Sequence, residues 1–247
     1  MKTIAPKTLS SIADTVWRIP VLKNVFSVFF KMYAKMVEKE NNKLFQKNGI
    51  KVLKDFDTLM MNNNIQYSVF AGTLLGAIRE GGFLSHDLDI DVVVFCDMFP
   101  SNARQLLEEN GFKFLHMFLV EDGKIGREET YIKDGVSIDI FFIYSDDDFA
   151  TYQCDFYPEN GAFSHRNSMN RFGYVRVRRL EFPVSRKVIR HPFSSIEVNV
   201  LANAKEWLTY RYGKDYMIPQ PDFRDKGDNP HICNWDKYKA VMIDEKD

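Results

Sequence analysis

Residues 85–95, SHDLDIDVVVF, place three aspartates directly before a run of valine and phenylalanine. Such a run is typical of a strand buried on both faces. Alternate residues of an extended chain share a face, so Asp87, Asp89 and Asp91 are predicted to point the same way. Two like charges about 4 Å apart repel by roughly 4 kcal/mol at an effective dielectric of about 20. The stretch is therefore either a solvated turn or the binding site of a cation.

The solvated turn suits Asp87, which follows Ser85 and His86, and it suits Asp91 poorly, because the apolar run begins at the next residue. Asp87 is accordingly expected to stay the most solvated of the three and to matter least. A hard divalent cation, Mg²⁺ or Mn²⁺, prefers carboxylate oxygens and would neutralise the group.

A second acidic position lies in residues 135–144, GVSIDIFFIY, where Asp139 is the only charged residue of a predicted strand. A lone carboxylate in such a run is costly unless it is paired or bound to a metal. A buried aspartate that accepts backbone hydrogen bonds or faces an arginine is the alternative. Together with Asp89 and Asp91, a metal cluster is the better explanation.

Gly72 and Thr73 stand between a predicted strand, residues 65–70, and a short predicted helix that ends near Gly81. Amide groups at a helix N-terminus suit a phosphate, to which a threonine can add its hydroxyl. A threonine that only caps the helix is the alternative. The position of this turn shortly before the aspartates favours phosphate binding.

The remaining pattern predicts an α/β protein with a mixed central sheet. Helical spacing covers residues 38–63, 101–111 and 194–213, and further strands are expected at 112–120, 129–144 and 174–184. The strand at 174–184 belongs to an arginine-rich stretch that includes Arg166, Arg171, Arg176, Arg178 and Arg179. These arginines either bind an anion or form a solvated face.

Composition excludes some classes of protein. The formal net charge of −1 argues against binding nucleic acid through bulk charge. Three widely spaced cysteines fit a reducing cytoplasm, and neither a secretory signal nor an apolar run of roughly 20 residues is evident. Residues 16–36 mix aromatic and basic side chains, which predicts a helix that either packs on the core or makes a peripheral contact with the inner face of a membrane.

Residues 72–92, GTLLGAIREGGFLSHDLDIDV, resemble the signature of the LicD family, roughly GTLLGAxRxxGFxPWDDDIDV, which fukutin and fukutin-related protein share. Weaker similarity continues through VSIDIFFIY and WLTYRYGKDYMIPQPDF, so that the resemblance covers residues 40 to 223. It implies a nucleotidyltransferase-like fold, with a mixed sheet flanked by helices and with N- and C-terminal helical additions. Residues 1–38 would form a helical extension and residues 39–247 the catalytic domain.

The resemblance also implies an activity. Such a protein transfers a phosphoryl-alcohol group, such as phosphocholine or an alditol phosphate, from a CDP-activated donor to a sugar hydroxyl of a surface glycan or lipid-linked oligosaccharide, and releases CMP. The matching residues would be the metal ligands Asp89, Asp91 and Asp139, and the substrate-binding residues Gly72, Thr73, Arg79, Asp87 and His86. This sequence departs from the signature where Ser85 and His86 replace Pro-Trp and where Leu88 replaces an aspartate.

Two other functions stay open. An NTP-dependent nucleotidyltransferase would use the same metals and release pyrophosphate. A pseudoenzyme would bind glycan or partners without catalysis, but the presence of all three aspartates speaks against it.

Overall fold

The computed structural model describes residues 20–145, 151–219 and 229–245, with side chains from residue 36 onward except that of residue 38. The chain groups into two compact units, Met1–Lys43 and Leu44–Asp247. The expected boundary at residues 38 and 39 lies inside a continuous helix, and the division into extension and catalytic domain stays a prediction. The side chains expected to face a membrane or the core fall mostly on residues 16–35, outside those described. Among the described residues no helix is both long and apolar enough to span a bilayer.

The helices are α2 (Pro20–Asn62), α3 (Ala71–Arg79), α4 (Ala103–Glu109), α5 (His165–Phe172) and α6 (Ala204–Tyr212), with short 3-10 turns η1 (Cys96–Met98) and η2 (Glu121–Gly123). The strands are β1 (Ser68–Val69), β2 (Asp89–Phe95), β3 (Lys113–Val120), β4 (Gly126–Lys133), β5 (Val136–Ser145), β6 (Thr151–Tyr157), β7 (Val175–Glu181), β8 (Val188–Phe193), β9 (Ile196–Leu201) and β10 (Ile232–Asp244).

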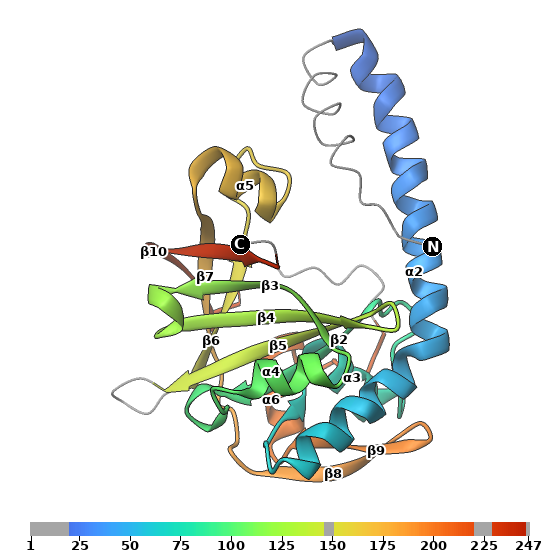
Figure 1. Ribbon diagram of the computed structural model, residues 1–247, viewed down its shortest axis with the longest axis vertical. Helices are drawn as coiled ribbons and strands as arrows, with labels where there is room; N and C mark the ends of the chain where they lie inside the picture. Colours follow the sequence, from blue (N-terminus) through green and yellow to red (C-terminus); the bar gives the residue numbers. More distant parts are fainter. Residues whose placement is uncertain (1–19, 146–150, 220–228, 246–247) are drawn as a thin grey trace. The chain divides into compact units, whose positions relative to one another are not determined.

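Eight strands of the second unit form one mixed sheet in the order β1-β2-β5-β4-β3-β10-β7-β6. Its centre, with β3, β4 and β5 side by side, is visible in Figure 1. Strands β2 and β5 are parallel, and β6 also pairs with β5, so that six antiparallel strands form a closed circuit of pairing. Strands β8 and β9 make a separate hairpin.

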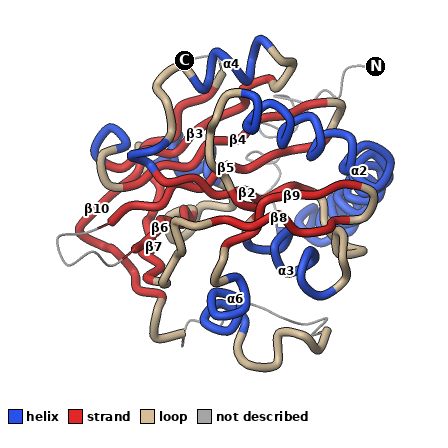
Figure 2. Tube along the Cα trace, turned by 90° about the horizontal axis from the view of Figure 1, so that it is seen from below, coloured by secondary structure: helices blue, strands red, loops and turns tan. Residues whose placement is uncertain are grey.

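Helices cover both faces of the sheet, and α4 lies on the opposite side from α3 and α6 (Figure 2). Phe56 of α2 packs edge-on against Phe112, and Arg104 of α4 lies over the Phe114 ring at the start of β3. On the other face, Phe70 packs against Trp207 of α6. Strand β2 is consequently buried on both faces after its first residues, which explains its continuous apolar run.

The predicted α/β class with a mixed sheet flanked by helices is confirmed. The expected strand at residues 65–70 shortens to Ser68–Val69, and Gly72 lies within the first turn of α3 rather than before it. The helix expected from residue 194 begins only at Ala204, because Ile196, Val198 and Val200 alternate as strand β9.

Of the expected C-terminal helical addition the described residues contain only α6, and they do not end in a helix. The last element is β10, a long strand that pairs with β3 and β7 inside the sheet. Polar and apolar side chains alternate along only part of β10, so the sequence gives little indication of a strand there. The assignment to a nucleotidyltransferase-like fold stays a prediction.

Candidate active site

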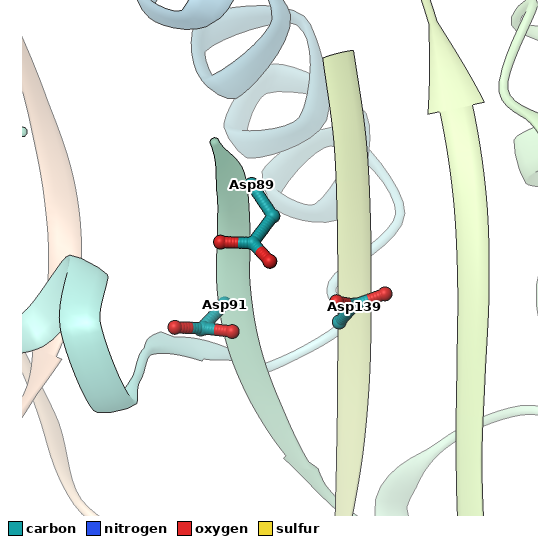
Figure 3. A group of neighbouring side chains, drawn as sticks. All are labelled: Asp89, Asp91 and Asp139. Atoms are coloured by element: carbon teal, nitrogen blue, oxygen red, sulfur yellow. The ribbon is translucent and has the colours of Figure 1, made fainter. Parts of the chain in front are cut away.

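The parallel pairing of β2 with β5 brings the predicted aspartates together. Asp91 lies directly opposite Asp139 in the register, and Asp89 stands two residues earlier on β2. One carboxylate oxygen from each of the three lies within 4.8 Å of the other two. Figure 3 shows Asp89 and Asp91 on one strand and Asp139 on its neighbour. The sheet register therefore builds an acidic cluster from two distant segments of the sequence.

Burial makes this cluster electrostatically costly. It raises the pKa of Asp139 to about 7, to which the charge of Asp89 contributes while a hydrogen bond from Thr130 opposes the shift. Burial also raises the pKa of Asp91 well above its ordinary range, and the charges of Asp89 and Asp139 add to the effect. The pKa of Asp89 is raised as well, because neighbouring parts of the protein displace some of its hydration although the side chain stays exposed at the start of β2. Full ionisation of the three carboxyl groups is therefore unfavourable unless a cation compensates their charge.

The N-terminus of α3 supports Asp91. The Gly72 amide donates to Asp91 Oδ2 at 3.1 Å, and the Asp91 amide donates to Thr73 Oγ1 at 3.0 Å. A Cβ at position 72 would lie 3.4 Å from Asp91 Oδ2, which is ordinary van der Waals distance, so the backbone of α3 packs directly against this carboxylate. Thr73 is only 1% exposed. Both residues thus hold the cluster in place, and their contact with a phosphate stays a prediction.

Asp87 is less solvated than expected. Its Oδ2 accepts the Leu84 amide at 2.7 Å, which closes the loop before β2. Burial raises its pKa to about 6, and Asp89, not Asp87, is the exposed aspartate of the stretch. The expectation that Asp87 remains the most solvated is wrong, because the loop folds back toward Gly72, whose Cβ position lies 3.7 Å from Asp87 Oδ1.

Arg79 and His86 flank this loop. The Arg79 Nε atom donates to Glu80 at 2.9 Å, and its Nη1 reaches the Tyr216 carbonyl oxygen at 3.3 Å. The positive charges of His86 and Arg79 both lower the pKa of Asp87, against the larger effect of its burial. His86 itself is exposed. Their roles in substrate binding stay predictions.

Two residues on β4 belong to the site although the sequence did not predict them. Thr130 lies opposite Asp139, and its hydroxyl donates to Asp139 Oδ1 at 2.6 Å. Glu128, two residues earlier on the same face, has a pKa raised well above its ordinary range, first by burial and then by the charge of Asp139. The alternation of GREETYIK marks which residues share a face, but only the pairing with β5 shows that this face is the acidic one.

The arginine-rich stretch is engaged by local contacts. Arg166 of α5 donates to Asp244 at 2.9 Å, Arg176 to Asn160 at 3.2 Å, and Arg178 lies over the Tyr157 ring. Arg171 donates to the Gly161 carbonyl oxygen at 2.6 Å. Binding of an anion by these side chains stays a prediction.

The three aspartates fit a divalent cation. They offer only hard oxygen donors, which Mg²⁺ and Mn²⁺ prefer. The separations of these oxygens suit one metal ion or two neighbouring metal ions. The raised pKa values show that the protein alone does not compensate their charge. Such a centre is suited to reactions in which negative charge develops on phosphate oxygens.

Comparison with known proteins identifies a family. The model of the LicD/FKTN/FKRP nucleotidyltransferase domain matches residues 64–202. An uncharacterized protein of Rickettsia prowazekii is 24% identical over 79% of this chain and 77% of its own length. Mouse ribitol-5-phosphate transferase FKTN is 25% identical over 76% of this chain, which spans 37% of that protein. An uncharacterized protein of Rickettsia typhi is 29% identical over 51% of the chain, corresponding to 40% of its own length. The matched region contains the whole acidic cluster.

Proposed function

Because the chain belongs to the LicD/FKTN/FKRP nucleotidyltransferase-domain family, we propose that it transfers an alcohol phosphate from a CDP-activated donor to a hydroxyl of a glycan and releases CMP. The observation that carries the proposal is the convergence of Asp89, Asp91 and Asp139 within 4.8 Å. A protein of this family that had lost catalysis would have no reason to keep three mutually repelling carboxylates together.

In this proposal Asp89, Asp91 and Asp139 hold one or two Mg²⁺ or Mn²⁺ ions. Ions bound there would neutralise charge on the donor diphosphate and favour loss of the acceptor hydroxyl proton. Gly72 and Thr73 fix the backbone and carboxylate of Asp91. Asp87 closes the loop that follows α3 by accepting the Leu84 amide. Arg79, at the end of α3, lies close enough for its charge to lower the pKa of Asp87, and in this proposal it supplies positive charge for a donor phosphate.

The bond that breaks is the one between the phosphorus distal to cytidine and the bridging oxygen. The acceptor oxygen forms a new bond to that phosphorus, its proton passes to a base or to water, and the bridging oxygen leaves with CMP. The product is a phosphodiester between alcohol and glycan. This choice of phosphorus rests on the family, within which FKTN is named a ribitol-5-phosphate transferase.

The acceptor in this proposal is a surface or capsular glycan, or its lipid-linked oligosaccharide precursor, at the cytoplasmic face of a membrane. No nucleic-acid partner is proposed, in keeping with the near-neutral charge of the chain. The alcohol is either choline or an alditol, and donor competition distinguishes the two.

A direct test incubates the purified chain and Mg²⁺ with CDP-choline or CDP-ribitol and an oligosaccharide acceptor, and measures CMP. We expect CMP release with one donor, lost in Asp139→Asn. Asp134→Asn is the matched control, because Asp134 lies on the surface and pairs with Lys51. Pyrophosphate release from an NTP, or cytidine attached to the acceptor, would instead show a nucleotidyltransferase.

A further inference from the structure

Thr130 is the direct neighbour of the third aspartate of the cluster. It lies opposite Asp139 in the antiparallel pairing of β4 with β5 and is only 6% exposed. Its hydroxyl donates to Asp139 Oδ1 at 2.6 Å, a short distance typical of a hydroxyl bound to a carboxylate. One oxygen of Asp139 is therefore engaged by the protein itself.

His116, on β3, is the next cross-strand neighbour after Thr130. It lies opposite Thr130 in the pairing of β3 with β4, and its Nε2 atom lies 3.3 Å from Thr130 Oγ1. A hydroxyl has a single proton, and that of Thr130 goes to Asp139. His116 must therefore donate through Nε2–H. Burial lowers the pKa of His116, which favours the neutral ring, and the contact with Thr130 assigns the single ring proton to Nε2.

We propose that Thr130 is a positioning residue of the metal centre, and that His116 in turn positions Thr130. The hydrogen bonds from His116 to Thr130 and from Thr130 to Asp139 hold Asp139 Oδ1, and they leave Oδ2 as the oxygen that binds the cation. This inference rests on the metal centre of the proposed function. It adds two residues from β3 and β4 that touch neither metal nor substrate.

The physical reason is that a carboxylate on a strand can rotate about its side-chain bonds, whereas a metal requires its oxygen at a fixed place. Groups that hydrogen-bond to metal ligands fix their orientation, and their loss typically costs about 10- to 100-fold in metal affinity. A threonine that only stabilised the sheet would affect unfolding instead and leave metal affinity unchanged.

The experiment measures Mn²⁺ binding to the full chain by calorimetry and by electron paramagnetic resonance, without substrate. Thr130→Val keeps the shape of the side chain but removes its hydroxyl, and we expect its dissociation constant for Mn²⁺ to rise about 10- to 100-fold. Thr130→Ser retains the hydroxyl and should bind within about threefold of the wild type. Thr209→Val is the matched control, because the Thr209 hydroxyl donates to the Lys205 carbonyl oxygen within α6.

A second pair of variants tests His116 and serves if Thr130→Val does not fold. His116→Phe removes the donor and should weaken Mn²⁺ binding by about threefold to tenfold, whereas His116→Gln supplies an amide donor and should restore part of the loss. Thermal unfolding without metal shows whether each variant is folded.

Equal Mn²⁺ affinity in wild type, Thr130→Val and His116→Phe would overturn the inference, as would equal losses in Thr130→Val and Thr130→Ser. A wild type that binds no Mn²⁺ would overturn it too. If the expected Mn²⁺ pattern is found but no CDP-alcohol yields CMP, the positioning role is supported and only the proposed function fails.

Discussion

Glu128 and Glu129 are neighbours on β4 but face opposite sides of the sheet. Glu129 is 1% exposed, and it accepts Arg127 Nε at 2.9 Å and the Tyr131 hydroxyl at 2.8 Å. Glu128 faces the acidic cluster, its pKa is raised by burial and by Asp139, and within the described residues no hydrogen bond or ion pair engages it. Two identical side chains, one residue apart, thus have opposite electrostatic environments.

The difference between these two glutamates distinguishes a carboxylate buried for stability from one buried for function. A buried carboxylate that stabilises a fold is paired and hydrogen-bonded, as Glu129 is. On the other face Glu128, Asp91 and Asp139 lie close together with too few donors to compensate them. Groups left in this state are typical of binding sites, where a ligand supplies the missing charge.

The largest expected effect is on catalysis. Asp91→Asn retains an acceptor for the Gly72 amide but removes one charge of the cluster. We expect CMP release to fall by about 10³-fold or more, because charge on the diphosphate is no longer stabilised. The same variant should be more stable than the wild type without metal, since like-charge repulsion is relieved. A lower melting temperature of Asp91→Asn than of the wild type in metal-free protein would contradict this account of the acidic face.

The second prediction uses the two glutamates as a matched pair. Glu129→Gln breaks the ion pair with Arg127 and should lower the free energy of unfolding by about 3 kcal/mol. Glu128→Gln is chemically the same change and should leave stability equal or raise it in metal-free protein. Urea unfolding of both variants measures the difference. If both lose the same stability, the two faces of β4 do not differ as described.

The third prediction concerns pH. The pKa values of Asp139, about 7, and Asp87, about 6, exceed their ordinary value of 3.8. Between about pH 4 and 7 the folded protein therefore binds more protons than the unfolded chain, and its stability falls as the pH rises through this window. Metal-free protein should melt several degrees higher at about pH 5.5 than at about pH 7.5.

Saturating Mg²⁺ should reduce or reverse this trend, because bound ions require deprotonated carboxylates. Differential scanning calorimetry at both pH values, with and without Mg²⁺, provides the measurement. A melting temperature that rises with pH in the metal-free protein would contradict the account.

The smallest expected effect is at Asp87. Asp87→Asn keeps a side-chain oxygen to accept the Leu84 amide, and it removes a charge that is not part of the cluster. We expect a loss of CMP release of about tenfold, well below that of Asp91→Asn. Steady-state kinetics of the two variants provides the comparison. A loss equal to that at Asp91 would show that Asp87 binds the metal or acts as a base.

The sequence predicted the cluster because its members carry local signals. Asp89 and Asp91 precede an apolar run, and Asp139 interrupts another. A carboxylate is unusual at each of these positions, and the few neighbouring residues are enough to show it. Thr130 and His116 carry no such signal in the sequence, and only the pairing of β3, β4 and β5 reveals their place beside the cluster. The C-terminal strand was missed for a related reason, since β10 is specified by its pairing with β3 and β7.

The loop before β2 shows the same limit. Alternation predicted that Asp87 shares a face with Asp89 and Asp91, and its distance from the apolar run predicted that it stays solvated, but strand pairing with β5 begins only at Asp89. Before that point the chain turns back onto the Leu84 amide, which no periodicity indicates.

The most direct test of the account is the position of Mn²⁺ in crystals soaked with this ion, located by anomalous diffraction at the manganese edge. The account predicts a peak about 2.2 Å from carboxylate oxygens of Asp89, Asp91 and Asp139, with Glu129 on the opposite face contacting none. Absence of a peak among the three aspartates at Mn²⁺ concentrations that saturate binding in solution, or a peak at another group of residues, would contradict it.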